Sequence, residues 1–172
     1  MSEDQPPKHL KNFAKLSQPV DATDEDNNTI FMHIADAAGK QIEKHQQVPG
    51  RGEKSISMNP DTMLGVISYC YAKGVYRSEE IEIFLWKDEA FLETYGNLLP
   101  SAEDIKRFRM RYREEILKTL DLALKEFWRH NPNPPKDLAK PTAEEMNTAM
   151  LSREEAKKRV DNAVFRDHLD AE

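Results

Sequence analysis

A run of basic side chains stands out within residues 101–113 of an otherwise acidic chain. These residues carry five cations against only two acids: Lys106, Arg107, Arg109, Arg111 and Arg113 against Glu103 and Asp104. Residues 61–100, just before them, carry seven acidic and three basic residues. Guanidinium groups form two hydrogen bonds with phosphate or with the edge of guanine. The stretch therefore has the chemistry of a polyanion-binding site.

Helical spacing indicates which of these cations would be exposed. With Phe108 turned inward and about 100° per residue, Lys106 and Arg113 point away from the core, and Arg107 and Arg109 flank it. Arg111 is expected nearer the buried stripe, extending along it or pairing with an acid. The other interpretation is a solvated basic helix face that pairs with the acids of the preceding helix.

Length and composition limit what such a site can belong to. The chain has 172 residues, enough for one domain with irregular ends. Its net charge of −6 argues against a protein that coats nucleic acid through bulk charge. It has no run of about 20 apolar residues that would span a membrane, and no secretory signal. Cys70, the single cysteine, excludes an internal disulfide. We expect a cytoplasmic protein without a membrane partner.

Apolar residues recur every three or four positions, which predicts an all-α fold. We find no alternating strand pattern and no glycine-rich phosphate loop. Caps, glycines and prolines place the ends of the expected helices. The expected helices are Ile30–Gln46, a helix from Asn59–Pro60 to Gly74, one from Ser78 with a break near Asp88, Ser101–Arg129, and Ser152–His168.

These elements predict a compact helical bundle with polar ends. Residues 1–28 are expected to be a disordered arm, 29–130 the helical domain, 131–151 a proline-rich linker and 152–172 a C-terminal helix. A capped helix from Ser78 and an arginine-rich helix from Ser101 form a helix-turn-helix-like pair. In that motif the second helix lies in the major groove of DNA.

The segment from Ile56 to Leu117 resembles the N-terminal helical domain of bacterial insertion-sequence transposases of the InsH-like, DDE class. The similarity covers about a third of the chain, and it depends on the order and spacing of several short pieces. They are Asn59-Pro60-Asp61-Thr62-Met63-Leu64, Ile67 to Ser78, Glu80-Ile81-Glu82, and Leu99 to Arg109. The family pattern combines a proline-led apolar helix that ends in tyrosines and glycine, an Arg-Ser step, and a late proline followed by a Phe-Arg pair.

This resemblance implies DNA binding, at terminal inverted repeats of a mobile element, and self-association as a homodimer. The implied contacts are Lys106, Arg107, Arg109 and Arg113, with Arg77 at the start of the previous helix. In the family the domain precedes a catalytic domain whose carboxylates bind two metal ions. Nothing after Leu117 has the strands or the length for such a domain. We therefore expect a module that is not an enzyme on its own and has no cofactor or metal.

The sequence context of the histidines, the cysteine and the tryptophans indicates structural roles for them. The histidines are too scattered to form a zinc site, and Cys70 lies among apolar residues that would keep its thiol unreactive. Trp86 and Trp128 each follow an apolar stripe, which indicates packing. A second hypothesis stays open: the helices mediate association with other proteins, and DNA binding has been lost. The long amphipathic helix that ends at Arg129 favours it.

Overall fold

The computed structural model describes residues 24–44, 58–96, 98–131, 134–140 and 147–170. Over these residues the protein is all-helical, as predicted, with seven α-helices, one short 3₁₀ helix and no strand. The helices are α2 (Asp24–Lys44), α3 (Pro60–Ala72), α4 (Ser78–Lys87), α5 (Glu89–Tyr95), α6 (Ala102–Arg111), α7 (Arg113–His130), η1 (Lys136–Leu138) and α8 (Thr148–Asp170).

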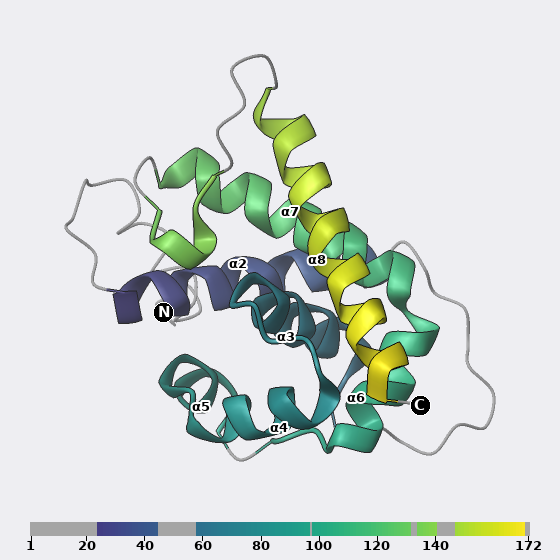
Figure 1. The fold of residues 1–172 in the computed structure, drawn as a ribbon. Coiled ribbons are helices and arrows are strands. Elements are labelled where there is room, and N and C mark those ends of the chain that lie inside the picture. Colours follow the sequence, from purple (N-terminus) through teal and green to yellow (C-terminus); the bar gives the residue numbers. More distant parts are fainter. Residues whose placement is uncertain (1–23, 45–57, 97, 132–133, 141–146, 171–172) are drawn as a thin grey trace.

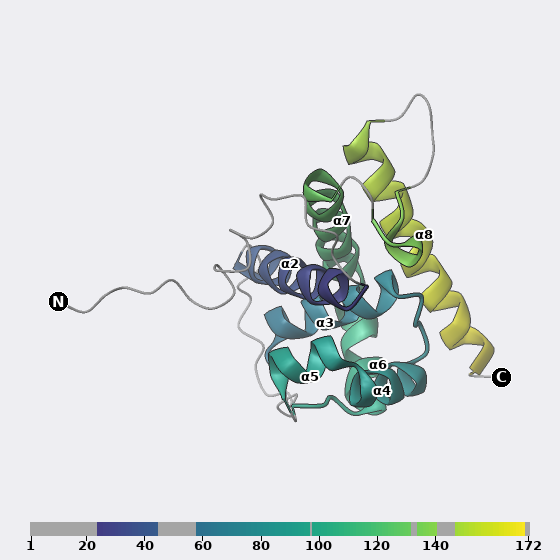
Figure 2. The ribbon, with the colours of Figure 1, turned by 90° about the vertical axis from the view of Figure 1, so that its left-hand side faces the viewer.

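Helix α3 is the centre of the bundle. Every residue from Met63 to Ala72 is buried, as expected for a helix that is apolar on all sides. Helices α2, α7 and α8 pack against it, and α4, α5 and α6 lie below it in the view of Figure 1. Figure 2 shows α2 crossing next to α3, with α8 along the side of α7. The core is therefore shared by helices from both ends of the described chain.

Two glycines allow α2 and α3 to approach each other closely. A Cβ atom added to Gly65 would lie 2.8 Å from Asp36 Cα and 2.9 Å from the Ala35 carbonyl oxygen, both in the backbone of α2. A Cβ added to Gly39 would collide with the Asp61 carbonyl oxygen in α3. The two helices therefore meet backbone to backbone, which only glycine permits at these positions.

Most of the predicted helix ends are confirmed. Gly74 adopts φ 78° just after α3, and Pro60 is the first residue of that helix. The Ser101 hydroxyl accepts a hydrogen bond from Asp104 N at 3.1 Å and caps α6. At the predicted break, Asp88 accepts a hydrogen bond from Phe91 N at 2.9 Å and caps α5. These ends follow from local backbone chemistry, and for that reason the sequence predicts them.

The predicted N-terminal boundary is wrong by several residues. The arm was expected to reach residue 28, but α2 begins at Asp24. Asn27 is buried, and its side-chain oxygen accepts a hydrogen bond from Asn131 Nδ2 at 2.7 Å. This contact joins positions 104 residues apart, so local sequence could not indicate it. The rest of the predicted arm, residues 1–23, lies outside the described residues, as does the predicted loop at 48–54.

The C-terminal region also differs from the prediction. The linker expected at 131–151 contains η1, and α8 begins at Thr148 rather than near residue 152. Leu138 is buried, and its carbonyl oxygen accepts a hydrogen bond from Trp128 Nε1 at 2.8 Å. Helix α8 buries its apolar side against α7, through Leu151, Ala156, Val160 and Ala163. The final helix is thus part of the bundle.

Candidate nucleic-acid interface

Helix α6 is held on α4 in an antiparallel orientation. The backbone nitrogen of Ala102, at the start of α6, donates to the Glu82 carboxylate at 2.7 Å. Near the other end of α6, Arg109 Nη1 donates to the Ser78 hydroxyl, at the start of α4, at 3.1 Å. Ile105 and Phe108 complete the buried side of α6. These contacts orient the rest of the helix toward the surface.

Four of the five cations in the basic stretch are exposed in the structure: Lys106, Arg107, Arg111 and Arg113. We call these four residues the α6–α7 cationic surface. The first three belong to α6, and Arg113 is the first residue of α7. This arrangement confirms the predicted exposure of Lys106, Arg107 and Arg113. Arg111 is exposed as well, and its guanidinium lies 5.3 Å from the centre of the Tyr112 ring.

Arg109, which was expected to contact DNA, is buried and does not lie on this surface. Its side chain is only 5% exposed. Besides the bond to Ser78, Nη2 donates to the Ala163 carbonyl oxygen at 3.1 Å, and the guanidinium lies 5.5 Å from the centre of the Tyr71 ring. Arg109 follows Ile105 by four positions, and such residues share a helix face. That spacing was a local sign that Arg109 faces inward, but it could not reveal the distant groups that hold the guanidinium there.

Ser78 also has a different role from the predicted one. It was expected to cap a helix, but Arg77 occupies the cap position and Ser78 is the first residue of α4. The Ser78 side chain is buried, with its hydroxyl bonded to Arg109. Arg77 directly precedes Ser78, the residue whose hydroxyl accepts the hydrogen bond from Arg109 of α6. The Arg77 guanidinium is within 3.7 Å of Glu80.

Nearby carboxylates pair with Arg107 and with Arg113. Arg107 lies 3.7 Å from Glu103 and 3.6 Å from Asp104, and Arg113 lies 3.3 Å from Asp161 of α8. Arg107 and Arg113 remain 54% and 53% exposed. Ion pairs at such exposure contribute only about 0–1 kcal/mol. The carboxylates therefore lower the local charge but do not hold these arginines in place.

The expected layout of two helices joined by a tight turn does not appear. Helix α5 lies between α4 and α6 in the chain, whereas the motif has a turn of about three or four residues. The long helix expected from Ser101 to Arg129 is also interrupted at Tyr112, where φ is −111° and ψ is 31°. Neither glycine nor proline marks this position, so no breaker residue could have predicted it.

Helix α8 adds residues to the candidate interface that the sequence did not suggest. Lys157 and Asp161 line a pocket of about 250 Å³ together with Arg113 and Glu114 of α7. The position of α8 depends on Arg159, whose Nη1 donates to the carbonyl oxygens of Tyr71 and Ala72 at the end of α3. Helix ends leave carbonyls without a partner inside the helix, although the Tyr71 carbonyl also accepts from Gly74 N at 3.1 Å. A single arginine in a charged helix gave no signal for this role.

The remaining candidate groups lie away from this surface. Cys70 is buried in α3, and burial, together with the Asp88 carboxylate, raises the pKa of its thiol. Burial and the hydrogen bond to Asp88 likewise raise the pKa of the Tyr69 hydroxyl. Trp128 is buried as expected, whereas no described residue buries Trp86, which is exposed. Among the described residues no cluster of three or more potential metal ligands occurs.

The membrane prediction has a partial test in the described helices. None of them is both long and apolar enough to cross a bilayer.

Comparisons with known proteins give no relative for this chain. No protein-family model matches it, and neither a curated protein nor a solved structure matches it. The resemblance to transposase N-terminal domains therefore stays a prediction from the sequence.

Proposed function

We propose that this protein is a non-catalytic DNA-binding module that contacts the phosphate backbone through the α6–α7 cationic surface. The observation that carries the proposal is the exposure of Lys106, Arg107, Arg111 and Arg113 at one helix junction. Arg77 is the weaker fifth candidate contact, one residue before Ser78, whose hydroxyl bonds to Arg109 of α6. Clustered cations on one face are the electrostatic footprint of a nucleic-acid-binding protein.

The carboxylates near these cations are compatible with the proposal. The pairs of Arg107 and Arg113 are exposed and longer than 3.2 Å, so they are weak. A phosphate offers each guanidinium two short, charge-assisted hydrogen bonds. Binding DNA would exchange a weak intramolecular pair for a stronger intermolecular one, and it would release condensed counterions.

The overall acidity of the chain bears on how selective its DNA binding would be. With a net charge of −6, the protein has no long-range attraction for DNA, so affinity depends on local contacts. We therefore propose selective binding, including terminal inverted repeats of a mobile element, rather than general coating. A module that binds such sites without cutting them would regulate transcription or movement of the element, and it would work in the cytoplasm.

Fluorescence anisotropy with labelled duplex DNA at low salt tests the proposal. The triple variant Lys106→Ala, Arg107→Ala and Arg113→Ala should lose most of its affinity. Each phosphate contact contributes about 0.9 to the slope of log affinity against log salt, so the slope should fall by up to about 3. Absence of binding by the wild-type chain to both random and inverted-repeat duplexes at low salt would contradict the proposal.

A second triple variant controls for the loss of three positive charges. Lys87, Lys136 and Lys140 are exposed and belong to α4, to η1 and to the segment after η1. Changing all three to alanine alters the net charge by the same amount as the test variant. If contacts are local, this control should bind like the wild type. Equal losses in both triple variants would mean that only net charge matters, and the cationic surface would not be the site.

The structure weakens the main observation behind the alternative, a module for protein association. The apolar stripe of α7 was the reason to expect a partner, but Ile116, Leu120, Leu124 and Phe127 are buried within the chain. Helix α7 packs on α2, α3 and α8. Self-association as a homodimer therefore has no support from this stripe, and light scattering would test it directly.

A further inference from the structure

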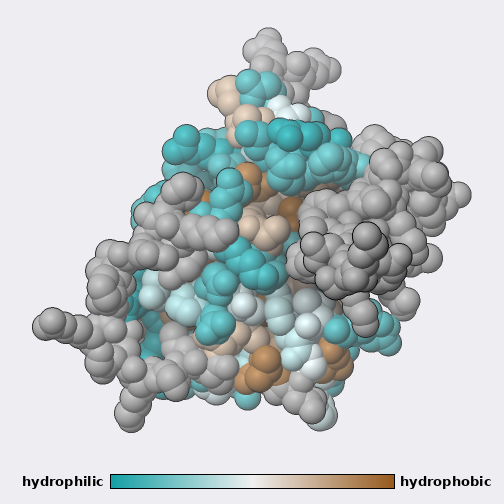
Figure 3. Space-filling view, turned by 180° about the vertical axis from the view of Figure 1, so that it is seen from behind, coloured by the Kyte–Doolittle hydropathy of each residue, from teal (hydrophilic) through white to brown (hydrophobic). Residues whose placement is uncertain are grey.

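The outer side of α4 carries two large apolar side chains that no described residue covers. Ile83 is 58% exposed and Trp86 is 64% exposed. They are three positions apart and so share a helix face, while Ile81 and Leu85 of the same helix are buried. We call Glu79, Ile83 and Trp86 the α4 outer face. Figure 3, seen from behind, shows small hydrophobic areas among hydrophilic ones, at mid-height and near the bottom of the described surface.

The charges around the α4 outer face indicate the chemistry of its partner. Glu79, Glu80 and Glu82 of α4 are exposed, and the nearest exposed cation of the helix is Lys87. This surface would repel the phosphates of DNA. An isoleucine and a tryptophan beside several carboxylates favour a partner that presents apolar and cationic side chains together.

The chain itself contains a segment with this composition. Residues 8–16 read Lys-His-Leu-Lys-Asn-Phe-Ala-Lys-Leu, with three lysines and no acid. Leu10, Phe13 and Leu16 recur every third position between the lysines. These residues lie outside the described part of the chain. Their sequence matches the α4 outer face in both charge and apolar character.

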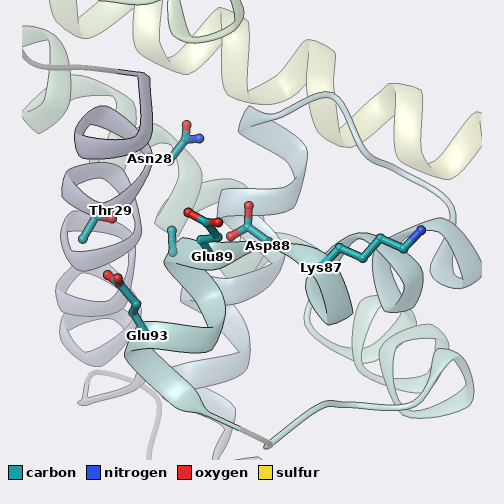
Figure 4. Close-up of a pocket in the computed structure, with 7 residues that line it drawn as sticks. Asn28, Thr29, Lys87, Asp88, Glu89 and Glu93 are labelled. Carbon is teal, nitrogen blue, oxygen red and sulfur yellow. The ribbon is translucent and has the colours of Figure 1, made fainter.

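The described chain begins close enough to α4 for this segment to reach it. Asn28 and Thr29 of α2 line a pocket of about 380 Å³ with Lys87, Asp88 and Glu89, at the junction of α4 and α5. Figure 4 shows the carboxylates of Asp88 and Glu89 beside α2, while the Lys87 side chain extends away from them. The first described residue is one helical turn before Asn28. Residues 17–23 can span up to about 24 Å.

We propose that residues 8–16 dock on the α4 outer face of the same chain. Leu10 and Phe13 would cover Ile83 and Trp86, and the lysines would lie near the glutamates of α4. A short tether keeps the effective concentration of the segment near millimolar, so even weak contacts hold it in place most of the time. This docking does not depend on DNA binding.

Fluorescence of Trp86 tests the docking in the full-length chain. The chain has two tryptophans, so replacing the buried Trp128 by phenylalanine leaves Trp86 as the only fluorescent reporter of this type. Changing both Leu10→Asp and Phe13→Asp should raise acrylamide quenching about two-fold and shift the emission to longer wavelength, as the tethered segment is released. Val20→Asp, a similar change outside residues 8–16, should leave quenching unchanged. Equal quenching in all three chains would overturn the proposal.

Limited trypsin digestion gives a second measurement without changing Trp128. Cleavage after Lys8, Lys11 and Lys15 should be slow in the wild type and faster in Ile83→Ser, which alters an exposed residue and should leave the fold intact. Equal cleavage rates would overturn the docking. Protection that increases with protein concentration, together with a dimer mass in light scattering, would assign the segment to a second copy and overturn docking within one chain.

Discussion

Replacement of Arg109 by methionine tests whether this residue supports the fold or contacts DNA. Its guanidinium donates to the Ser78 hydroxyl and to the Ala163 carbonyl oxygen, each at 3.1 Å. Hydrogen bonds from a charged group contribute about 1.5–3 kcal/mol each, and the Tyr71 ring adds roughly 0.5–2 kcal/mol. Methionine keeps the aliphatic packing and avoids the desolvation of a charge, which offsets part of this loss. We expect the free energy of unfolding to fall by about 2–4 kcal/mol.

Urea denaturation followed by circular dichroism measures this change. For a protein of this size each kcal/mol lowers Tm by about 2–4 °C, so Tm should fall by roughly 5–15 °C. Below the new Tm the variant remains folded. The affinity of the variant for DNA should then stay within about two-fold of that of the wild type, because the substitution removes no surface contact.

The exposed neighbour Lys106 supplies the matched control. Lys106→Met should change the free energy of unfolding by less than about 0.5 kcal/mol but should weaken DNA binding. If Arg109→Met left stability unchanged and abolished DNA binding, the assignment of Arg109 to the core would be refuted. The two variants together separate a structural arginine from a surface cation one turn away.

Two further predictions concern the core. Gly65→Ala should lower the free energy of unfolding by about 1–3 kcal/mol, because the added Cβ would meet the α2 backbone at 2.8–2.9 Å. This loss is expected although alanine favours helices. In urea denaturation, Ser68→Ala in the same helix should lower the free energy of unfolding by less, and equal losses would contradict close contact between the two helices. Stability should also fall as pH rises above about 10, because burial raises the pKa of Tyr69 and Tyr95 in the folded state, while the unfolded chain loses these protons. Absorbance of tyrosinate with pH should show both hydroxyls titrating only on unfolding, and normal titration of either in the folded protein would be the contrary result.

Local signals in the sequence were enough to predict helix type and most helix ends. The all-α fold follows from apolar residues at helical spacing, and Pro60, Gly74 and Ser101 mark helix ends through their own backbone chemistry. The exposure of Lys106 and Arg107 also followed from their angle to Phe108. All of these depend on residues within a few positions of one another.

Contacts between distant residues explain the errors. Asn27 joins α2 because it bonds to Asn131, and Arg109 is buried because α8 supplies the Ala163 carbonyl oxygen. Arg159 holds α8 on the end of α3 in the same way. Each of these pairs is more than 50 residues apart, so no pattern along the chain could bring them together.

The sequence by itself therefore determined that this protein is a helical bundle with a cationic stretch in an acidic chain. Only the tertiary structure decided that Arg109 leaves the surface on which the other four cations lie. Helical periodicity orients a side chain relative to its own helix. The groups that Arg109 meets come from other helices, namely Ser78 of α4, Ala163 of α8 and Tyr71 of α3. For this reason Arg109 became part of the core, while Lys106, Arg107, Arg111 and Arg113 stayed exposed.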